Sequence, residues 1–322
     1  MLKKLSVKKL ALTTVALFAI LLIYLIPGND HKLDTISDLE YVNANVTINP
    51  IFLLDKNSYV SLSEVVLTNT QIEEKALELL NVLTVGGADS KIPSGFKAIL
   101  PPDTRVLSLK YKDGLIKVDF SDDILDVSDE MEEKIVEAIV YTLTSIDDVD
   151  KIIIYVEGEI LTKLPKSKIN LPSTLDRSYG INKKYEFTSI NDINSVTVYY
   201  VSQNNGREYY IPVTKYLNDN RDKISIVIDE LTIGLNYNEK LMSFLNSDAK
   251  LVSSSIDGDT LKLEFNSSLF DDVTTKEVLE EVVYTICLSA YDNYDVENVS
   301  LIVNNEEIYK TTSKILENKK DL

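Results

Sequence analysis

The 322-residue chain has one histidine, one cysteine and no tryptophan. Histidine is the usual general base of serine and cysteine hydrolases, and zinc sites need clustered histidine and cysteine. His31 stands alone near the start of the chain, far from Cys287. These scarcities argue against a catalytic triad and a zinc centre. A single cysteine also excludes an intramolecular disulfide, and Cys287, inside an apolar helical run, is expected in the core.

Basic residues are also scarce, with 33 Lys and Arg against 51 Asp and Glu, for a formal net charge of −18. A surface this acidic repels nucleic acid and offers no basic groove that could release counterions. We therefore expect no nucleic-acid partner. The acidity has two interpretations, which are solubility and a surface that receives a cationic partner.

The chain lacks a phosphate-binding loop and an EF-hand loop. Gly86-Gly87 is not followed by the Lys-Ser/Thr of a P-loop, and we interpret it as the end of a helix. Carboxylates gather in three places: Asp119, Asp122 and Asp123; Asp147, Asp148 and Asp150; and Asp257 with Asp259. In turns and at helix starts, aspartate binds backbone N–H groups; weak calcium binding and acid–base catalysis are the alternatives. The sequence predicts no enzyme, no cofactor, and no catalytic or metal-binding residue.

The first 28 residues have the pattern of a signal-anchor. Lys3, Lys4, Lys8 and Lys9 precede Leu10–Ile26, a run of seventeen residues without a charge. That length is at the short end of a transmembrane helix, and the lysines place the N-terminus in the cytoplasm. We expect a single-pass protein of the cell membrane, bound to the cytoplasmic membrane through Leu10–Ile26, with residues 30–322 extracytoplasmic. A cleaved signal is the alternative, and no nearby cysteine could carry a lipid.

The rest of the chain is a duplication. VLTVG at 82–86 returns as ELTIG at 230–234, KDGLIKVDF at 112–120 as DGDTLKLEF at 257–265, and VYTL at 140–143 as VYTI at 283–286. Such long offsets indicate two copies of one domain, because solenoid repeats recur about every 20–50 residues. We predict a spacer at 29–43, domains at 44–160 and 195–310, a connector at 161–194 and a tail at 311–322. The connector is either flexible or packed on the domains.

Both copies predict the same order of elements. Strands are expected at Val46–Leu54 and Tyr59–Leu62, at Val196–Val201 and Tyr209–Val213, and at the closing segments Ile152–Val156 and Val299–Val303. Asp113-Gly114 and Asp257-Gly258 predict hairpins in which Ile116, Val118 and Phe120, or Leu261, Leu263 and Phe265, face the core. The fold class is therefore α+β: two tandem two-layer modules, each β-(β)-α-β-β-α-β, with helices on one face of a mixed, mostly antiparallel sheet.

Each copy also predicts two helices from apolar stripes. In the first helices the stripes are Ile72, Ala76, Leu79, Leu80 and Leu83, and Ile224, Val227, Ile228 and Leu231. In the second helices they are Met131, Ile135, Val136, Ile139, Val140 and Leu143, and Val278, Leu279, Val282, Val283, Ile286 and Cys287. Expected starts are the capping boxes Thr70 with Glu73 and Thr274 with Glu277, and Ser128. Gly86 and Gly234 are expected in left-handed caps.

Tyrosine is abundant, with 18 residues. Tyr199, Tyr200, Tyr209 and Tyr210 lie in predicted strands, where tyrosine suits a half-buried sheet and, alternatively, a protein interface. Tyr141 and Tyr284 are predicted to occupy the same place in the two copies and to lie in the core.

The segments LPPDTRVLSLKYKDGLIKVDFSDDI (100–124) and EAIVYTLTSIDDVDKIIIYVEGE (137–159) resemble the GerMN domain of sporulation and spore germination. LPSTLDRSYGINKKYEFTS (171–189), with VTVYYV (196–201) and YYIPVTKYL (209–217), resembles the start of the second copy in tandem members. The resemblance covers roughly 45–310 and is weaker in the second copy, where LNSDAKLVSSSIDGD replaces the LPP-type turn.

This resemblance implies an extracytoplasmic, non-enzymatic protein of endospore-forming bacteria. Tandem members are similar to ring-building modules between the mother-cell and forespore membranes, where they support a protein complex. We expect a membrane-anchored scaffold whose partners are other envelope and sporulation proteins. A module that binds wall glycan or small solutes at the cell surface is the alternative. The sequence gives no oligomeric state.

Overall fold

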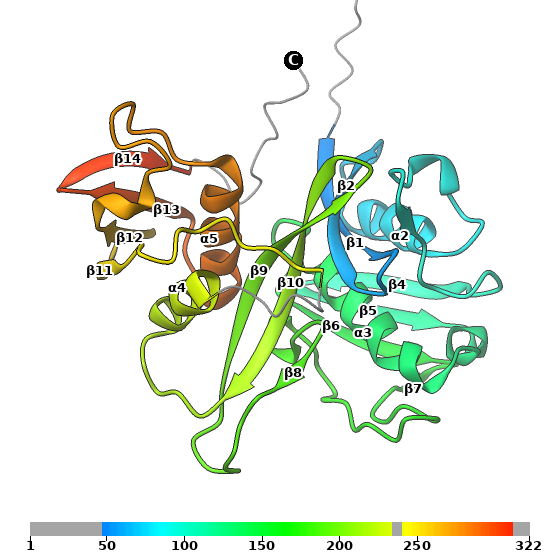
Figure 1. Ribbon diagram of the computed structural model, residues 1–322. Coiled ribbons are helices and arrows are strands. Elements are labelled where there is room, and N and C mark those ends of the chain that lie inside the picture. Colours follow the sequence, from blue (N-terminus) through cyan, green and yellow to red (C-terminus); the bar gives the residue numbers. More distant parts are fainter. Residues whose placement is uncertain (1–46, 234–239, 312–322) are drawn as a thin grey trace, which may run out of the picture. The chain divides into compact units, whose positions relative to one another are not determined.

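The computed structural model describes residues 47–233 and 240–311 (Figure 1). The predicted signal-anchor with Leu10–Ile26, the spacer 29–43, Gly234 and the tail beyond Thr311 lie outside these residues. None of the helices in the described ranges combines the length and the apolar character that crossing a membrane requires.

The first module follows the predicted order of elements. Its strands are β1 (Thr47–Asp55), β2 (Val60–Leu67), β3 (Phe96–Lys97), β4 (Val106–Lys112), β5 (Leu115–Phe120), β6 (Lys151–Val156) and β7 (Glu159–Ile160). Its α-helices are α2 (Ile72–Leu83) and α3 (Asp129–Leu143), with 3₁₀ turns at Asp89–Lys91 and Asp122–Leu125.

The second module repeats this order, without a counterpart of β3 among the described residues. Its strands are β9 (Asn194–Asn204), β10 (Arg207–Leu217), β11 (Leu251–Asp257), β12 (Thr260–Phe265), β13 (Asn298–Val303) and β14 (Glu306–Lys310). Its α-helices are α4 (Lys223–Ile233) and α5 (Glu280–Asn293), with a 3₁₀ turn at Ser267–Leu269. Between the modules, the connector forms a 3₁₀ turn at Arg177–Tyr179 and β8 (Lys184–Tyr185).

The strands of each module divide between two sheets. Their orders are β2-β1-β3 and β4-β5-β6-β7 in the first module, and β8-β10-β9 and β11-β12-β13-β14 in the second. The pairs β5–β6, β12–β13 and β8–β10 are parallel, and the other pairs are antiparallel. Helices α3 and α5 provide the crossovers that join β5 to β6 and β12 to β13. The predicted α+β class with mixed, mostly antiparallel pairing is confirmed.

Both hairpins have two-residue turns, but the Asp-Gly pair lies one position earlier in the second than in the first. In the first, Asp113 and Gly114 both have positive φ, which is the backbone of a type I′ turn. In the second, Asp257 is the last residue of β11, and Gly258 begins the turn with φ of +59°. The predicted core faces are correct, because Ile116, Val118, Phe120, Leu261, Leu263 and Phe265 are all buried.

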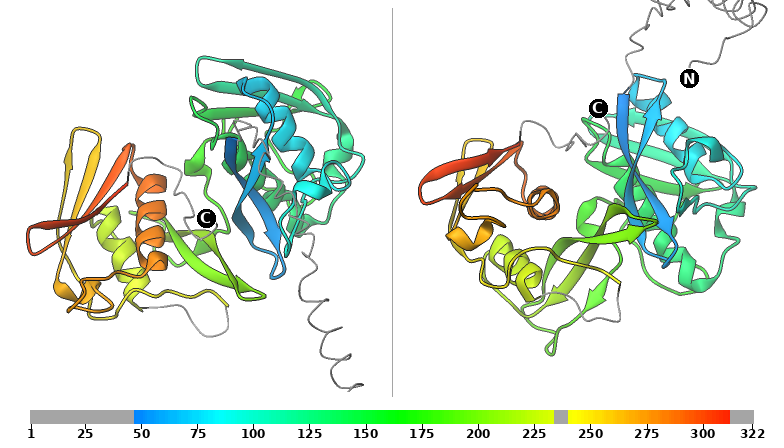
Figure 2. Two further views of the ribbon diagram at one scale, coloured as in Figure 1. Left: turned by 90° about the horizontal axis from the view of Figure 1, so that it is seen from above. Right: turned by 45° about the horizontal axis from the view of Figure 1, so that its top comes forward.

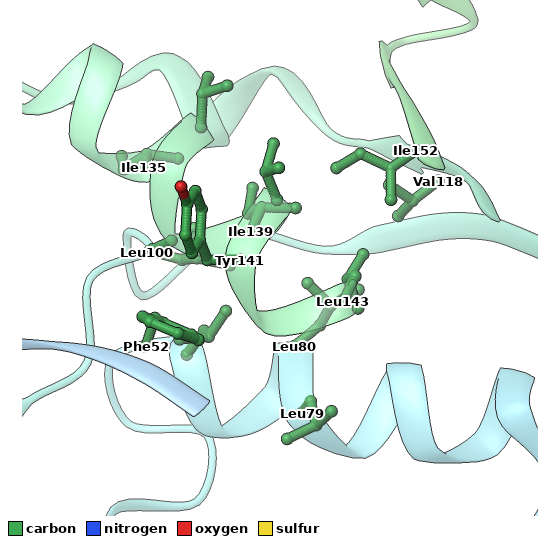
Figure 3. Close-up of a cluster of buried hydrophobic side chains, with 14 of the residues drawn as sticks. Phe52, Leu79, Leu80, Leu100, Val118, Ile135, Ile139, Tyr141, Leu143 and Ile152 are labelled. Atoms are coloured by element: carbon green, nitrogen blue, oxygen red, sulfur yellow. The ribbon is translucent and has the colours of Figure 1, made fainter. Parts of the chain in front are cut away.

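The predicted helix stripes form the cores. In the first module, α2 contributes Leu79 and Leu80 to the core that also contains Tyr141 and Leu143 of α3 (Figure 3). The ring of Tyr141 meets Phe52 of β1 edge to face, with centroids 5.3 Å apart. In the second module the stripe of α4 is buried, and Cys287 of α5 is fully buried, as expected. Burial also raises the pKa of the Cys287 thiol.

Both predicted capping boxes are wrong, whereas Ser128 does precede α3. Helix α2 begins at Ile72 after Gln71, and the Glu73 carboxylate accepts the N–H of Tyr111 in β4 instead of capping. Helix α5 begins only at Glu280. Upstream, the Asp272 carboxylate accepts the N–H of Thr274 at 2.6 Å, and this local turn competes with helix formation.

Gly86 has φ of +78°, but it does not cap α2 as predicted. The helix ends one turn earlier, where Thr84 takes an extended backbone conformation. The N–H of Gly86 donates to the Asp89 carboxylate at 3.1 Å. The glycine therefore serves the loop after the helix.

Matching hydrogen bonds define the register of the duplication. The Thr142 hydroxyl of α3 accepts the N–H of Phe52 at 3.0 Å, and the Ser289 hydroxyl of α5 accepts the N–H of Tyr199 at 2.9 Å. Both pairs of residues are related by an offset of 147. Tyr141 is therefore equivalent to Leu288, and the predicted equivalence of Tyr141 with Tyr284 is wrong by one helical turn. Both tyrosines are nevertheless buried, at 0% and 9% exposure.

Candidate functional site

The connector is packed against the modules rather than flexible. Its side chains Leu164, Leu171, Leu175 and Ile181 are buried. Both described modules and the connector belong to one compact unit. In Figures 1 and 2, β10 lies beside β2, in agreement with their many close residue pairs.

Two buried glutamates of α3 hold the connector in place. The Glu132 carboxylate accepts the N–H groups of Lys166 at 2.8 Å and Ser167 at 2.7 Å. Further along the helix, Glu137 accepts the N–H of Asn182 at 2.9 Å. Both ends of the connector are thus bonded to the same helix.

The two glutamates differ in their electrostatics although each is only 2% exposed. Burial alone would raise the pKa of Glu132, but the two backbone N–H groups outweigh it and lower the pKa. Burial raises the pKa of Glu137 to about 7, because Lys183 and the single N–H of Asn182 offset it only in part. The charged form of Glu132 therefore stabilises the folded connector, whereas the charged form of Glu137 destabilises the folded state.

Asn182 bonds the two modules together. Its side-chain oxygen accepts the N–H of Val60 at 3.0 Å, and its amide donates to the carbonyl oxygens of Val60 and Pro212, each at 2.8 Å. Val60 begins β2 and Pro212 lies in β10. One side chain therefore joins a strand of each module. Asn182 has φ of +47°, a conformation that asparagine tolerates better than most residues.

Arg177 makes a second link between the modules. Its guanidinium pairs with Asp292 of α5, and it donates to the hydroxyl oxygens of Thr144 at 3.2 Å and Ser145 at 2.7 Å. The Tyr199 hydroxyl donates to the other oxygen of Asp292 at 2.9 Å. Burial alone would lower the pKa of Arg177, but the Asp292 carboxylate raises it, so the side chain stays charged.

The same guanidinium lies over two aromatic rings. Its central carbon is 4.9 Å from the ring centroid of Tyr141 and 5.7 Å from that of Phe52. Aromatic faces attract cations through the ring quadrupole. Arg177 is therefore held by a carboxylate on one side and by aromatic faces on another.

A cleft with a volume of about 1360 Å³ lies between the modules. Its lining includes Arg177 and Asp292, the strands β2 and β10, helix α5, and the turns that follow α3 and α5. Nine carboxylates and three cationic side chains line it, together with five tyrosines. This cleft is the candidate functional site, because it is concave, acidic and built from both copies.

The predicted carboxylate groups separate in the structure. Asp147, Asp148 and Asp150 lie on the turn after α3 and line the cleft. Asp119 and Asp123 serve local structure: Asp119 accepts the N–H of Gly158 at 3.1 Å, and Asp123 accepts the Ser121 hydroxyl at 2.8 Å.

The remaining acidic group lies elsewhere. Asp257 pairs with Lys262 at 2.6 Å on the β11–β12 hairpin, outside the cleft lining. Within residues 47–233 and 240–311, no three His, Cys, Asp or Glu side chains are grouped as metal ligands would be.

Sequence reasoning did not identify Arg177, Asn182 or the two glutamates of α3. The apolar stripe of α3 identifies its core face but does not indicate that Glu132 and Glu137 are buried. The sequence signal that could have found Asn182 is local: an asparagine lies two residues after Gly180 in a connector that contains Leu164, Leu171 and Leu175, and both Gly and Asn tolerate positive φ.

Comparison with known proteins gives a family. The family model "Germane: Sporulation and spore germination" matches this chain twice, at residues 50–162 and 197–309. The chain belongs to the Germane family. It is 35% identical over 269 residues to the spore germination protein GerM of Bacillus subtilis (strain 168), covering 81% of this chain and 72% of that protein.

A solved structure of the tandem GerMN domains of the sporulation protein GerM from Bacillus subtilis is similar to this one. The TM-score is 0.74 at 32% identity, and the match covers 85% of this chain and 94% of that one. The resemblance to the GerMN family is therefore confirmed in both copies. The two Germane segments leave out residues 163–196, so Arg177 and Asn182 lie between the matched modules rather than within them.

Proposed function

We propose that this Germane protein is a membrane-anchored, extracytoplasmic scaffold that supports a protein complex during sporulation and spore germination. The observation that carries the proposal is the similarity to GerM, whose name places it in spore germination, across both modules and the connector. The scaffold acts through protein–protein contacts and not as an enzyme. Its chemistry supports this, since the chain offers one histidine and one cysteine, and Cys287 is buried.

The membrane location is part of this proposal. It rests on the sequence alone, because the basic start and the apolar run Leu10–Ile26 have the pattern of an uncleaved signal-anchor. In sporulating cells the modules would then lie in the space between the mother-cell and forespore membranes. Two experiments test this. The protein should sediment with the membrane fraction, and protease added to intact protoplasts should digest residues 30–322.

Imaging through a sporulation time course tests the function. A functional fusion to an oxidation-tolerant reporter at the exported end should gather at the engulfing septum, and deletion should reduce the number of heat-resistant spores. Uniform signal around growing cells, with normal spore numbers after deletion, would contradict the proposal.

Binding to wall glycan is a second candidate, favoured by one exposed aromatic pair. Tyr185 is 63% exposed and stacks on Tyr216, with ring centroids 5.1 Å apart. Exposed aromatic faces are common at binding surfaces. Sedimentation with purified sacculi that is lost in Tyr185→Ala would support this candidate, and a protein that stays in solution would exclude it.

A further inference from the structure

The turns after α3 and α5 are equivalent parts of the two copies, and both line the cleft. Asp148 corresponds to Asp295, and Asp150 to Glu297, at the offset of 147 set by the matching hydrogen bonds. The backbone confirms this match: the N–H of Asp150 donates to Gly114, and the N–H of Glu297 donates to Asp259 at the same place in the other hairpin. The duplication therefore presents the same acidic turn from two sides.

These carboxylates face solvent. Asp148, Asp150, Asp295 and Glu297 are all exposed. Glu208 of β10 and Glu64 of β2 add two more exposed carboxylates to the lining. Like charges gathered on one concave surface repel each other, and a cationic partner relieves that repulsion.

Aromatic rings complete the chemistry of the lining. Tyr210 of β10 stacks on Tyr284 of α5, with centroids 5.5 Å apart and an interplanar angle of 28°. Burial raises the pKa of Tyr210, and the carboxylates of Glu281, Glu280 and Glu208 raise it further, so negative charge surrounds this pair. Tyrosine faces beside carboxylates attract guanidinium and ammonium groups.

The cleft already holds one such cation in this way. Arg177 lies over the rings of Tyr141 and Phe52 while it pairs with Asp292. An arginine supplied from outside would meet the accessible part of Tyr210, which is only half-buried, beside the Glu208 carboxylate.

We infer that the cleft between the modules is the docking surface for a lysine- and arginine-rich segment of a partner protein. This inference rests on the proposed function, because it gives the chemistry of one of the protein contacts that a scaffold needs. Charge complementarity supports the choice of partner: of the nine carboxylates and three cationic side chains in the lining, Asp292 and Arg177 pair with each other, which leaves eight carboxylates and two cations.

The test uses the full chain in detergent micelles and a fluorescent twelve-residue peptide of alternating arginine and valine. A peptide of alternating glutamate and valine is the ligand control. Fluorescence anisotropy should show binding of the arginine peptide at low salt, weaker binding as salt rises, and no binding of the glutamate peptide.

Two variants with the same change in charge locate the site. Asp148→Asn with Asp295→Asn neutralises the paired turns and should weaken binding of the arginine peptide at least tenfold. Asp122→Asn with Glu130→Gln neutralises two exposed carboxylates outside the cleft and should change the affinity for the arginine peptide less than twofold. Equal weakening in both variants would overturn the inference, because the attraction would then be a property of the whole surface.

Two further outcomes separate this inference from others. A chain that ends at Thr311 and binds the peptide tenfold more tightly than the full chain would assign the cleft to residues 312–322 and overturn the partner assignment. A deletion strain with normal sporulation contradicts the proposed function, whereas loss of peptide binding in the paired-turn variant would still support the cationic site.

Discussion

The phenol of Tyr209 donates a 2.8 Å hydrogen bond to Oδ2 of Asp55, and both residues are almost fully buried although they belong to different modules. Oδ1 of the same carboxylate accepts the N–H groups of Asn57 and Tyr59, each at 2.8 Å. Asp55 therefore closes the turn between β1 and β2 and also joins the modules. Its position makes the stability of that turn depend on the second module.

Tyr209→Phe should lower the free energy of unfolding by about 1–2 kcal/mol, because a buried carboxylate oxygen loses its donor. Urea denaturation measures this change. Tyr111→Phe is the control, since it removes a hydroxyl that donates to the backbone carbonyl oxygen of Asp148 at 3.0 Å, within the first module and near solvent. Equal losses in the two variants would show that the contact between the modules has no special weight.

Asn182 can be tested with two substitutions that separate its side chain from its backbone. Asn182→Gly removes three hydrogen bonds but keeps the left-handed conformation easily, and it should cost about 2 kcal/mol of unfolding free energy. Asn182→Ala should cost about 1 kcal/mol more, because alanine is strained at φ of +47°. If the Asn182→Gly variant and the parent protein unfolded at the same urea concentration, the Asn182 side chain would not stabilise the contact between the modules.

The pKa of Glu137 predicts a dependence of stability on pH. Its folded-state pKa of about 7 lies above the ordinary value of 4.5, so its stabilising contribution is complete below about pH 4.5. That contribution is lost as pH rises through 7, for a total of about 3 kcal/mol.

Glu137→Gln should remove this loss. Relative to the parent, the variant should gain stability as pH rises from 5 to 8, as measured by urea unfolding at each pH. Glu130→Gln, in the exposed first turn of the same helix, is the control. If the difference in unfolding free energy between Glu137→Gln and the parent stayed constant from pH 5 to 8, the raised pKa would not belong to Glu137.

Gly86 should tolerate asparagine better than valine. No atom lies within 4 Å of a Cβ built at this residue, so the cost comes from φ of +78° alone. Gly86→Val should lower the free energy of unfolding by about 1 kcal/mol or more, and Gly86→Asn by clearly less. Thermal unfolding of the two variants side by side checks this, and equal melting temperatures would contradict it.

Local patterns in the sequence predicted the elements well. The alternation in 115–120 and 260–265 and the apolar stripes of α2, α3 and α4 depend only on which side chains avoid water, so the core faces followed directly. The start of α5 was missed because Lys276 has φ of +57° and the backbone of Glu277 pairs with that of Asp271 and Asp272, which keeps this segment out of the helix. The division of each module into two sheets depends on pairing between distant strands, which no local pattern contains.

The candidate site was only partly predictable. The carboxylates at Asp147, Asp148 and Asp150 were identified from composition, but their meeting with Asp295 and Glu297 needed the arrangement of both modules. The shared letters VYTL and VYTI aligned Tyr141 with Tyr284, because four residues of a helix return the chain to the same face. The hydroxyls of Thr142 and Ser289 corrected this, since only one register lets both accept a strand N–H.

The attachment of the connector to α3 at two points makes its length a fixed spacing. Between the Glu132 contact at Lys166 and the Glu137 contact at Asn182, residues 172–174 are three consecutive exposed residues between the buried Leu171 and Leu175. An inserted peptide tag would loop outward there and leave both attachment points in register. The same insertion after Asn182 would shift β8 against β10. Residues 172–174 are therefore suited to carrying a label, whereas the segment after Asn182 has to keep its length.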